Sequence, residues 1–445
     1  MHRKIFLPLF FTAIFLFTNG SSHAQQYWMQ KGGGITIDEA ADISIDASGN
    51  SYATGYFTST ATFGSFTLNS SGVEDIYIVK LNAAGQYQWA VKAGGSGTDR
   101  PTSIKTDASG NSYITGFFSG TATFGSQSVS SAGAQDVFIA KYNNAGVCQW
   151  AKSAGGTLAD IGNGITVDNS GNVIVTGEFA GTSSFGSTSL TSMNGSVDVF
   201  TTKLDGSGNF LWAKKGSAHL TDRGLDVAAD GSGNIYITGQ FTDTITFDVT
   251  HNNNMYNAIF LVKYNSAGTE QWFRLIGGAS ANFANGIVCD NSGNVLLAGD
   301  FQGTLTFFAA PSNTSLSGTY LNKIFVVKYD GSGNKTWSSQ SSSSSELTAR
   351  NLAVDASANP FVIGNFKCRL SDYADVYGQG TFNSVGYRDV FVSKWNSSGA
   401  WQWARNIGGH KDDYGTGITL NAMGEVIFTA SFNQDIIVPS RNTFL

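Results

Sequence analysis

The sequence is poor in charge, cysteine and proline, and these shortages exclude several classes of protein. Charged residues make up 13% of its 445 residues, against about 25% in an ordinary soluble protein. The formal net charge is −6, so the chain lacks the basic surface that nucleic-acid binding requires, and we expect no nucleic-acid partner. The hydrophobic share of 41% and the aromatic share of 13% still provide enough apolar material for a core, which argues against disorder.

Cysteine and histidine are too few and too scattered for a disulfide framework or a metal cluster. The three cysteines fall at unrelated positions: Cys148, Cys289 and Cys368. We interpret them as buried thiols. Beyond the N-terminal segment the histidines are His219, His251 and His410, none with a partner at metal-binding spacing. We therefore expect no cofactor.

A long apolar run occurs near the N-terminus. Arg3 and Lys4 precede the apolar run 5–17, and the short polar stretch 18–24 places small residues before Gln25. This pattern predicts a secretory signal peptide at 1–24. The run is shorter than the roughly 20 residues of a membrane span, so we expect no transmembrane segment in the mature chain. We expect a secreted protein, outside the cell or at its surface, and a monomer.

The sequence is otherwise dominated by one unit that recurs about seven times. Its tryptophans stand 60 to 66 residues apart: Trp28, Trp89, Trp150, Trp212, Trp272, Trp337 and Trp403. A fixed period of this kind is typical of stacked repeats and propellers, because one unit is too small to bury its own apolar face. We expect each indole to pack between neighbouring units, where an aromatic side chain buries on the order of 150–250 Å².

Each unit contains four short β-type segments separated by Gly, Asn, Asp and Ser turns. In the third unit they are Ile165–Asp168, the stretch 172–179, Asp198–Lys203 and the segment that carries Trp212. The turn between the first two segments reads DNSGN at 168–172, and Asp and Gly are the residues that tight hairpin turns require. Each unit is therefore predicted to be a four-stranded antiparallel meander.

The predicted fold is all-β, a seven-bladed β-propeller of four-stranded antiparallel blades, because radial closure protects sheet edges. We expect a single domain over 25–445, with repeats near 42–92, 103–153, 164–215, 224–275, 286–338, 351–405 and 417–445 plus 26–34. The last blade is expected to be incomplete and closed by the Trp28 strand, since no third segment follows Phe432. Either the chain ends early or 435–438 substitutes weakly.

The repeated motifs resemble those of secreted bacterial β-propeller repeat proteins of the SBBP type. The resemblance rests on 165–179, Asp198–Lys203 and the paired glycines Gly155 and Gly156, and it extends over about 28–435. It implies a propeller without an assigned activity and supplies no catalytic residues. The third-segment aspartate is replaced by Ala258 and Lys323 in two repeats, so no function can require it in every blade.

An acidic residue lies five positions before the first segment in five repeats: Asp38, Asp99, Asp160, Asp222 and Asp413. If the first segment is innermost, these residues could form an acidic rim around a central channel and bind cations or basic ligands. The alternative is that each carboxylate only binds its own loop backbone. The DxSGN turns also resemble calcium loops but lack the bidentate glutamate of an EF-hand. We interpret them as turns that could take up calcium adventitiously.

These patterns predict an exported, non-enzymatic binding or scaffolding module for an unknown protein or glycan ligand. The alternative is a polysaccharide-active or quinoprotein-like propeller enzyme with its site at the central channel, in which carboxylates from different blades converge. A purely structural role is the third possibility. Whether the chain is an enzyme stays open, with the residue pattern favouring a non-enzyme. The stretches that depart most from the repeat are 251–256, 308–320, 338–345 and 367–378, so we expect any specific site toward the later blades.

Overall fold

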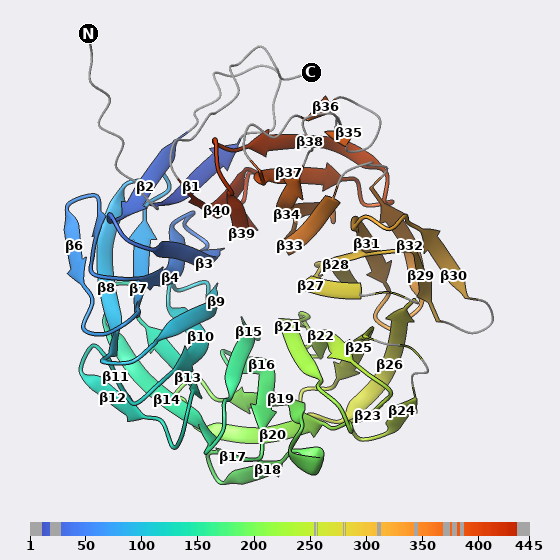
Figure 1. Ribbon diagram of the computed structural model, residues 1–445, viewed down its shortest axis with the longest axis horizontal. Coiled ribbons are helices and arrows are strands. Elements are labelled where there is room, and N and C mark those ends of the chain that lie inside the picture. The colour runs from blue at the N-terminus through green and yellow to red at the C-terminus, as the bar shows by residue number, and fades with distance from the viewer. Residues whose placement is uncertain are drawn as a thin grey trace.

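The computed structural model shows an all-β protein whose sheets lie around a common centre (Figure 1). The residues described are 11–17, 28–252, 255, 257–278, 280, 282–308, 313–341, 346–367, 374–375, 381–382 and 387–433. Their only helix is a three-residue 3-10 turn, η1 (Met193–Gly195). In that part of the chain, no helix has the length and apolar character needed to cross a membrane.

Four strands recur in the same order along the chain, and we call them the first, second, third and fourth strands. Each sheet is named here after its first strand. The first strands are β3 (Asp38–Ile45), β9 (Arg100–Thr106), β15 (Ile161–Val167), β21 (Arg223–Ala229), β27 (Asn282–Cys289), β33 (Glu346–Val354) and β39 (Tyr414–Leu420). The second strands are β4 (Ser51–Phe57), β10 (Ser112–Phe118), β16 (Val173–Ala180), β22 (Ile235–Phe241), β28 (Val295–Phe301), β34 (Pro360–Lys367) and β40 (Val426–Phe432).

The third and fourth strands complete the antiparallel meander that the repeat predicted. The third strands are β7 (Asp75–Leu81), β13 (Asp136–Tyr142), β19 (Val197–Leu204), β25 (Ala258–Tyr264), β31 (Lys323–Tyr329) and β37 (Asp389–Trp395). The fourth strands are β8 (Tyr87–Gly95), β14 (Cys148–Gly156), β20 (Phe210–Gly216), β26 (Glu270–Gly277), β32 (Lys335–Gln340) and β38 (Trp401–Ile407). The first strands touch one another in sequence, and β39 also touches β3.

The β39 sheet differs from our expectation of a missing third strand. The structure places β1 (Phe11–Phe17) between β40 and β2 (Met29–Gly33), antiparallel to both. These residues belong to the predicted signal peptide, so the same apolar run fits two descriptions, a leader and a third strand. The proposed substitute at 435–438 lies outside the described residues.

The turns form as the sequence predicted, with aspartate as the organising residue. In the turn 46–50, Gly49 N–H donates to the Asp46 carbonyl at 3.0 Å, and Asp46 Oδ1 accepts Ser48 N–H and Asn50 N–H, each at 2.9 Å. Gly49 has φ = +81°, which only glycine adopts without strain. The same bonds recur in the other DxSGN turns, which fixes the register of the first two strands.

An outer hairpin between the second and third strands was not predicted. The hairpins are β5 (Thr60–Phe63) with β6 (Phe66–Asn69), β11 (Thr121–Phe124) with β12 (Gln127–Ser130), β17 (Thr182–Phe185) with β18 (Thr188–Thr191), β23 (Thr244–Thr246) with β24 (Thr250–Asn252), β29 (Thr304–Phe307) with β30 (Thr314–Ser317), and β35 (Ala374–Asp375) with β36 (Thr381–Phe382). Several of them pair with the fourth strand of the preceding sheet, as β11 does with β8 and β17 with β14. Adjacent sheets are thus joined by backbone hydrogen bonds as well as by packing.

The hydrophobic core lies between consecutive sheets. One cluster joins Ile76 and Ile78 of β7 to Ile104 of β9 and to Phe118 and Phe138, all buried. Clusters of the same kind recur around the molecule. Each unit therefore buries its apolar face against its neighbours, as expected for a repeat of this size.

Candidate binding channel

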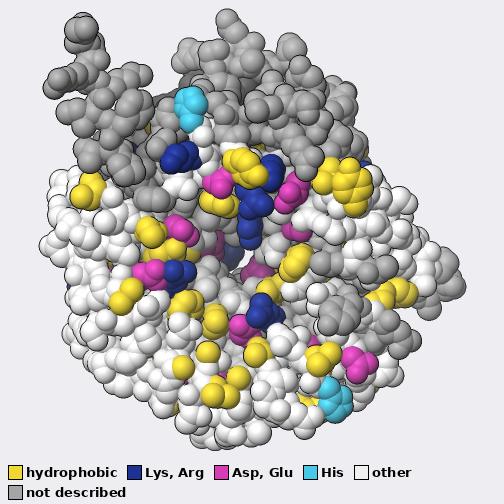
Figure 2. Space-filling model, viewed as in Figure 1, with side chains coloured by type: hydrophobic (Ala, Val, Ile, Leu, Met, Phe, Trp, Pro, Cys, Tyr) yellow, Lys and Arg dark blue, Asp and Glu magenta, His cyan; other side chains and the backbone are white. Residues whose placement is uncertain are grey.

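A cavity of about 390 Å³ lies at the centre and is lined by residues of all the first strands, β3, β9, β15, β21, β27, β33 and β39. Figure 2, viewed down the shortest axis of the molecule, shows acidic and basic side chains around the central hollow. The cavity is polar: its lining includes Asp42, Asp226, Lys105 and Arg350. It is the candidate functional site.

A β-bulge in every first strand shapes the wall of this channel. The pairing of first and second strands skips one residue in each sheet. The skipped residues are Ala41, Thr102, Asn163, Leu225, Asn285, Arg350 and Thr416. All of them line the cavity, because a bulge re-aims the side chain of its extra residue.

Three bulge residues also connect neighbouring sheets. Thr102 Oγ1 donates to the carbonyl of Gly162 at 2.5 Å, and Asn163 Nδ2 donates to that of Gly224 at 2.8 Å. Asn285 Nδ2 makes the corresponding bond to a carbonyl of the next sheet at 2.9 Å. Sequence reasoning missed these residues because their types differ between repeats. Only their fixed place, two residues before the aliphatic residue that begins each predicted first segment, could have marked them.

The residue after each bulge resumes the pairing with the second strand, and four of these seven residues, Asp42, Ser103, Asp226 and Asn351, line the cavity. The set is Asp42, Ser103, Gly164, Asp226, Gly286, Asn351 and Gly417. Burial raises the pKa of Asp42 to about 6, although hydrogen bonds from Ile104 N–H and Ile43 N–H lower it in part. Burial likewise raises the pKa of Asp226 to about 7, and the charge of Asp42 adds to that rise. Two carboxylates from different sheets therefore influence each other across the channel.

The five aspartates predicted as a channel rim are not at a rim. Their exposed fractions are 1% or less for all of Asp38, Asp99, Asp160, Asp222 and Asp413. None belongs to the cavity lining. The alternative stated with the prediction holds: each carboxylate accepts loop backbone N–H groups, as Asp160 does from Gly156 at 2.7 Å and Ala180 at 3.1 Å.

Four of these five buried carboxylates occur in pairs with third-strand aspartates. Both Asp75 and Asp99 face the Cα of Gly94, since a Cβ there would lie 2.2 Å from Asp75 Oδ1 and 2.9 Å from Asp99 Oδ2. Gly155 lies in the same way between Asp136 and Asp160. Burial raises the pKa of Asp99 and of Asp160 to about 6, and the partner aspartate adds to each rise.

In two repeats both members of the pair are replaced. In one repeat Ala258 replaces the third-strand aspartate, and Asn282 replaces the acidic residue that lies five positions before the next first segment. Lys323 and Leu347 make the same two replacements in another repeat. Four pairs keep both members, among them Asp198 with Asp222, where burial raises the Asp222 pKa to about 8. Asp38 has no such partner, because β1 takes the place of the third strand and contains no acidic residue. A buried carboxylate pair holds its proton readily because two adjacent negative charges repel each other.

The tryptophans lie between adjacent sheets, each against a turn of the next repeat. A Cβ on Gly146 would lie 2.9 Å from the Trp89 ring, and a Cβ on Gly208 would lie 2.8 Å from the Trp150 ring. The same contact joins Trp28 to Gly85, Trp212 to Gly268, Trp272 to Gly333 and Trp337 to Gly399. Trp403 packs against the cluster of the β39 and β33 sheets. Trp150 Nε1 also donates to the carbonyl of Gly206 at 3.2 Å.

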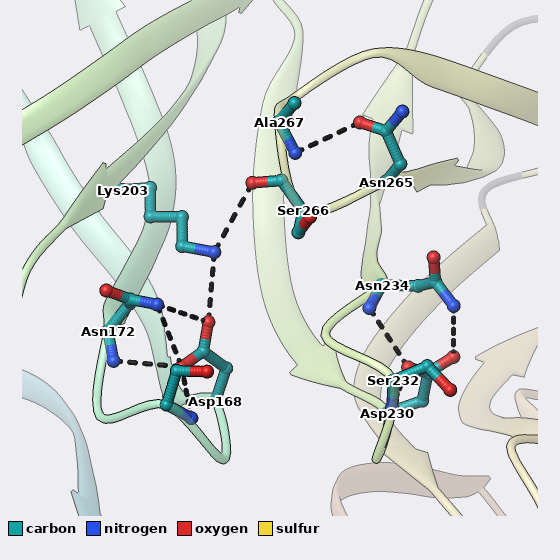
Figure 3. A network of polar contacts seen from close by, with 10 residues as sticks. Asp168, Asn172, Lys203, Asp230, Ser232, Asn234, Asn265, Ser266 and Ala267 are labelled. Atoms are coloured by element: carbon teal, nitrogen blue, oxygen red, sulfur yellow. Dashed lines mark hydrogen bonds and ion pairs between the residues drawn. The ribbon is translucent and has the colours of Figure 1, made fainter.

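The lysine of the third strand adds an ion pair to the same contact between adjacent sheets. Lys203 Nζ lies 2.9 Å from Asp168 Oδ2 and 3.3 Å from the carbonyl oxygen of Ser266 in the next repeat (Figure 3). Burial alone would raise the Asp168 pKa, but hydrogen bonds from Asn172 and Lys203 outweigh it and lower the pKa. The oxygens of this turn are thus used for the fold, and the described residues contain no group of three or more His, Cys, Asp or Glu placed to hold a metal ion.

The fold and the channel together define a β-propeller repeat protein. Residues 271–300 match the family model described as SBBP, beta-propeller repeat. The chain is 23% identical over 93% of its length to an uncharacterized WD repeat-containing protein, L264, of Acanthamoeba polyphaga mimivirus. It spans 36% of that relative's length.

The comparison with solved structures gives matches at low sequence identity and low TM-score. Sqt1 from Chaetomium thermophilum is 10% identical with a TM-score of 0.42, covering 91% of this chain and 98% of that one. A eukaryotic initiation factor is 8% identical with a TM-score of 0.32, covering 89% of this chain and 96% of that one.

Proposed function

We propose that this chain is a closed, seven-bladed β-propeller that serves as a non-enzymatic binding or scaffolding module. Contact between β39 and β3, together with successive contacts of the other first strands, supports the closed ring. The similarity to a WD repeat-containing protein supports a non-catalytic repeat module. The predicted leader supports export to the cell surface or beyond.

The chemistry of the channel is the observation that carries this proposal. The described residues that line it include no histidine and no cysteine. Its serine, Ser103, donates its hydroxyl to the Asp42 carboxylate at 3.0 Å, and the described lining residues include no histidine to act as the base of a serine nucleophile. The remaining lining groups are hydrogen-bond donors and acceptors on a rigid wall, an arrangement suited to recognition.

A channel-blocking variant tests this function. Ala41 is the smallest bulge side chain and is only half-buried, so Ala41→Phe should fill the channel without disturbing the blades. We expect a glycan array and a peptide array to yield saturable ligands for the wild type that the variant does not bind. Ligands bound equally by both proteins would place recognition elsewhere, and no ligand on either array would contradict a binding module.

A hydrolytic function is the second candidate, because two carboxylates with raised pKa face one cavity. A pair of acids is what glycoside hydrolysis requires. Incubating the wild type and Asp226→Asn with a panel of polysaccharides and following reducing-end release separates the two functions. Turnover by the wild type that the variant lacks would establish an enzyme, whereas no turnover by either supports the binding module.

A further inference from the structure

Asp42 and Asp226 occupy the same position of two different first strands but have different surroundings. Each carboxylate accepts the N–H of the following residue at 2.8 Å, from Ile43 and from Val227. Each also accepts an N–H from the next sheet, which is Ile104 at 3.2 Å for Asp42 and Ile287 at 3.0 Å for Asp226. The backbone therefore fixes both carboxylates in one orientation.

Side chains complete the coordination of Asp42 but not that of Asp226. Ser103 Oγ donates to Asp42 Oδ2 at 3.0 Å, and Asn351 Nδ2 donates to Asp42 Oδ1 at 3.1 Å across Gly417. The sheets on either side of Asp226 have glycines, Gly164 and Gly286, at the corresponding position. Asp226 thus has one donor on each oxygen where Asp42 has two.

A carboxylate can accept about four hydrogen bonds, two on each oxygen. Asp226, a half-buried residue, therefore keeps acceptor capacity on the wall of a cavity of about 390 Å³. Lys105 and Arg350 line the same cavity. Among the described residues, however, no cationic nitrogen lies within 4.0 Å of its oxygens.

We propose that Asp226 is the anchor for a guest carrying a cationic nitrogen, a guanidinium or an ammonium group, bound in the central channel. This inference rests on the proposed binding function and names the chemistry of its ligand. The group can come from a small molecule or from a basic side chain of a partner protein. A guanidinium donates two parallel hydrogen bonds to a carboxylate, which uses both oxygens at once.

A metal ion fits the site less well than a hydrogen-bonding cation. Calcium takes six to eight oxygen ligands, whereas here one carboxylate has spare capacity and the Asp42 oxygens are already saturated. Backbone N–H groups surround both acids, and donors of this kind repel a metal. The guest is accordingly expected to bring hydrogen-bond donors of its own.

The test is titration calorimetry of the full chain with arginine amide, and with citrulline amide as the neutral isostere. At pH 8 we expect arginine amide to bind and citrulline amide to bind at least tenfold more weakly. Asp226→Asn should lower the affinity for arginine amide at least tenfold. Glu39→Gln, which removes another acid from the same cavity, should change it less than threefold. Equal binding of the two amides, or full binding by Asp226→Asn, would overturn the proposal.

A second variant avoids altering the carboxylate itself. Leu225 is the bulge residue of the same strand, at the position where β33 carries Arg350. Leu225→Arg should place an internal guanidinium beside Asp226 and abolish binding with the fold intact, as circular dichroism can verify. Unchanged affinity in this variant would count against Asp226 as the anchor.

Titration with a peptide as the ligand identifies the source of the cationic group. Tighter binding of Gly-Arg-Gly than of arginine amide supports a partner's side chain, and the reverse supports a free small molecule. Failure of all these ligands, while Ala41→Phe still abolishes array binding, refutes the cationic guest and leaves the proposed function standing. If every channel variant still binds the array ligands, the proposed binding function of the channel is refuted.

Discussion

The buried carboxylate pairs predict that the protein becomes less stable as the pH rises. The strongest case is Asp222, which is 0% exposed and whose pKa burial raises from 3.8 to about 8, with the charge of Asp198 contributing. The folded state then holds a proton that the unfolded state releases between about pH 4 and pH 8. Stability is greatest below the unfolded pKa and falls across that window.

The variant Asp222→Asn removes this titration at little geometric cost. Asp222 Oδ1 accepts Thr242 N–H at 3.1 Å, and its Oδ2 has no hydrogen-bond partner among the described residues. An amide can therefore keep the first bond and put its nitrogen at the second position. The chain itself uses asparagine at the equivalent Asn282. A shift of about four pKa units at ~1.4 kcal/mol each gives an upper bound of ~6 kcal/mol for ionising Asp222.

Urea unfolding at pH 4, 6, 8 and 9 measures the difference. We expect the free energies of unfolding of wild type and Asp222→Asn to agree within ~1 kcal/mol at pH 4. At pH 9 the variant should be more stable by a few kcal/mol. The control Asp205→Asn changes an exposed turn residue whose pKa backbone hydrogen bonds lower, so it should show no gain at high pH. A pH-independent difference for Asp222→Asn would refute the role of the buried proton.

Three substitutions at the joint between sheets have expected effects on the free energy of unfolding, measured by urea titration. Trp150→Phe loses an inter-sheet hydrogen bond, whereas the indole nitrogen of Trp212 has no hydrogen-bond partner in the described part of the chain. Trp150→Phe should therefore cost ~1–2 kcal/mol more than Trp212→Phe, and equal costs would contradict the bond's contribution. Gly208→Ala adds a methyl 2.8 Å from a tryptophan ring, while Gly171→Ala has the same positive φ and open space. The first should therefore be the more destabilising, and the reverse order would contradict the packing. Lys203→Met leaves a buried carboxylate without its cation and should cost ~3 kcal/mol; a cost near zero would contradict a structural ion pair.

The repeat made most of the fold predictable. The fixed spacing of Trp150 and its counterparts, the DNSGN turn and the short β segments were enough to predict four antiparallel strands per unit. The outer hairpins were missed because segments such as Thr121–Phe124 are only four residues long and pair with a different repeat. Pairing between repeats leaves no local signal in the sequence.

The site was less predictable than the fold. Asp99 and its equivalents stood out as acidic residues at a fixed position, but spacing cannot tell a buried acid from one at a channel mouth. The β-bulge moved the channel-facing positions to residues such as Asp226 and Leu225, whose types vary between repeats. A one-residue shift of register decides which side chains face the cavity, and that shift comes from backbone geometry.

The N-terminal run presents a related ambiguity. An apolar stretch such as Phe11–Phe17 suits both the core of a leader and the buried third strand of a sheet, because both environments require apolar side chains. Mass spectrometry of the protein isolated from its host cells and from their medium distinguishes them, since cleavage before Gln25 removes the strand and an intact N-terminus retains it.

Closure of the ring is the central claim, and a distance between spin labels tests it most directly. Labels at Ala47 and Ala422 sit in the exposed turns after β3 and β39, and a reference pair at Ala47 and Ala108 sits in the turns after β3 and β9. Because β3 touches both β9 and β39, double electron–electron resonance should give similar distances for the two pairs. A distance between Ala47 and Ala422 several times longer than the reference would contradict the closed propeller.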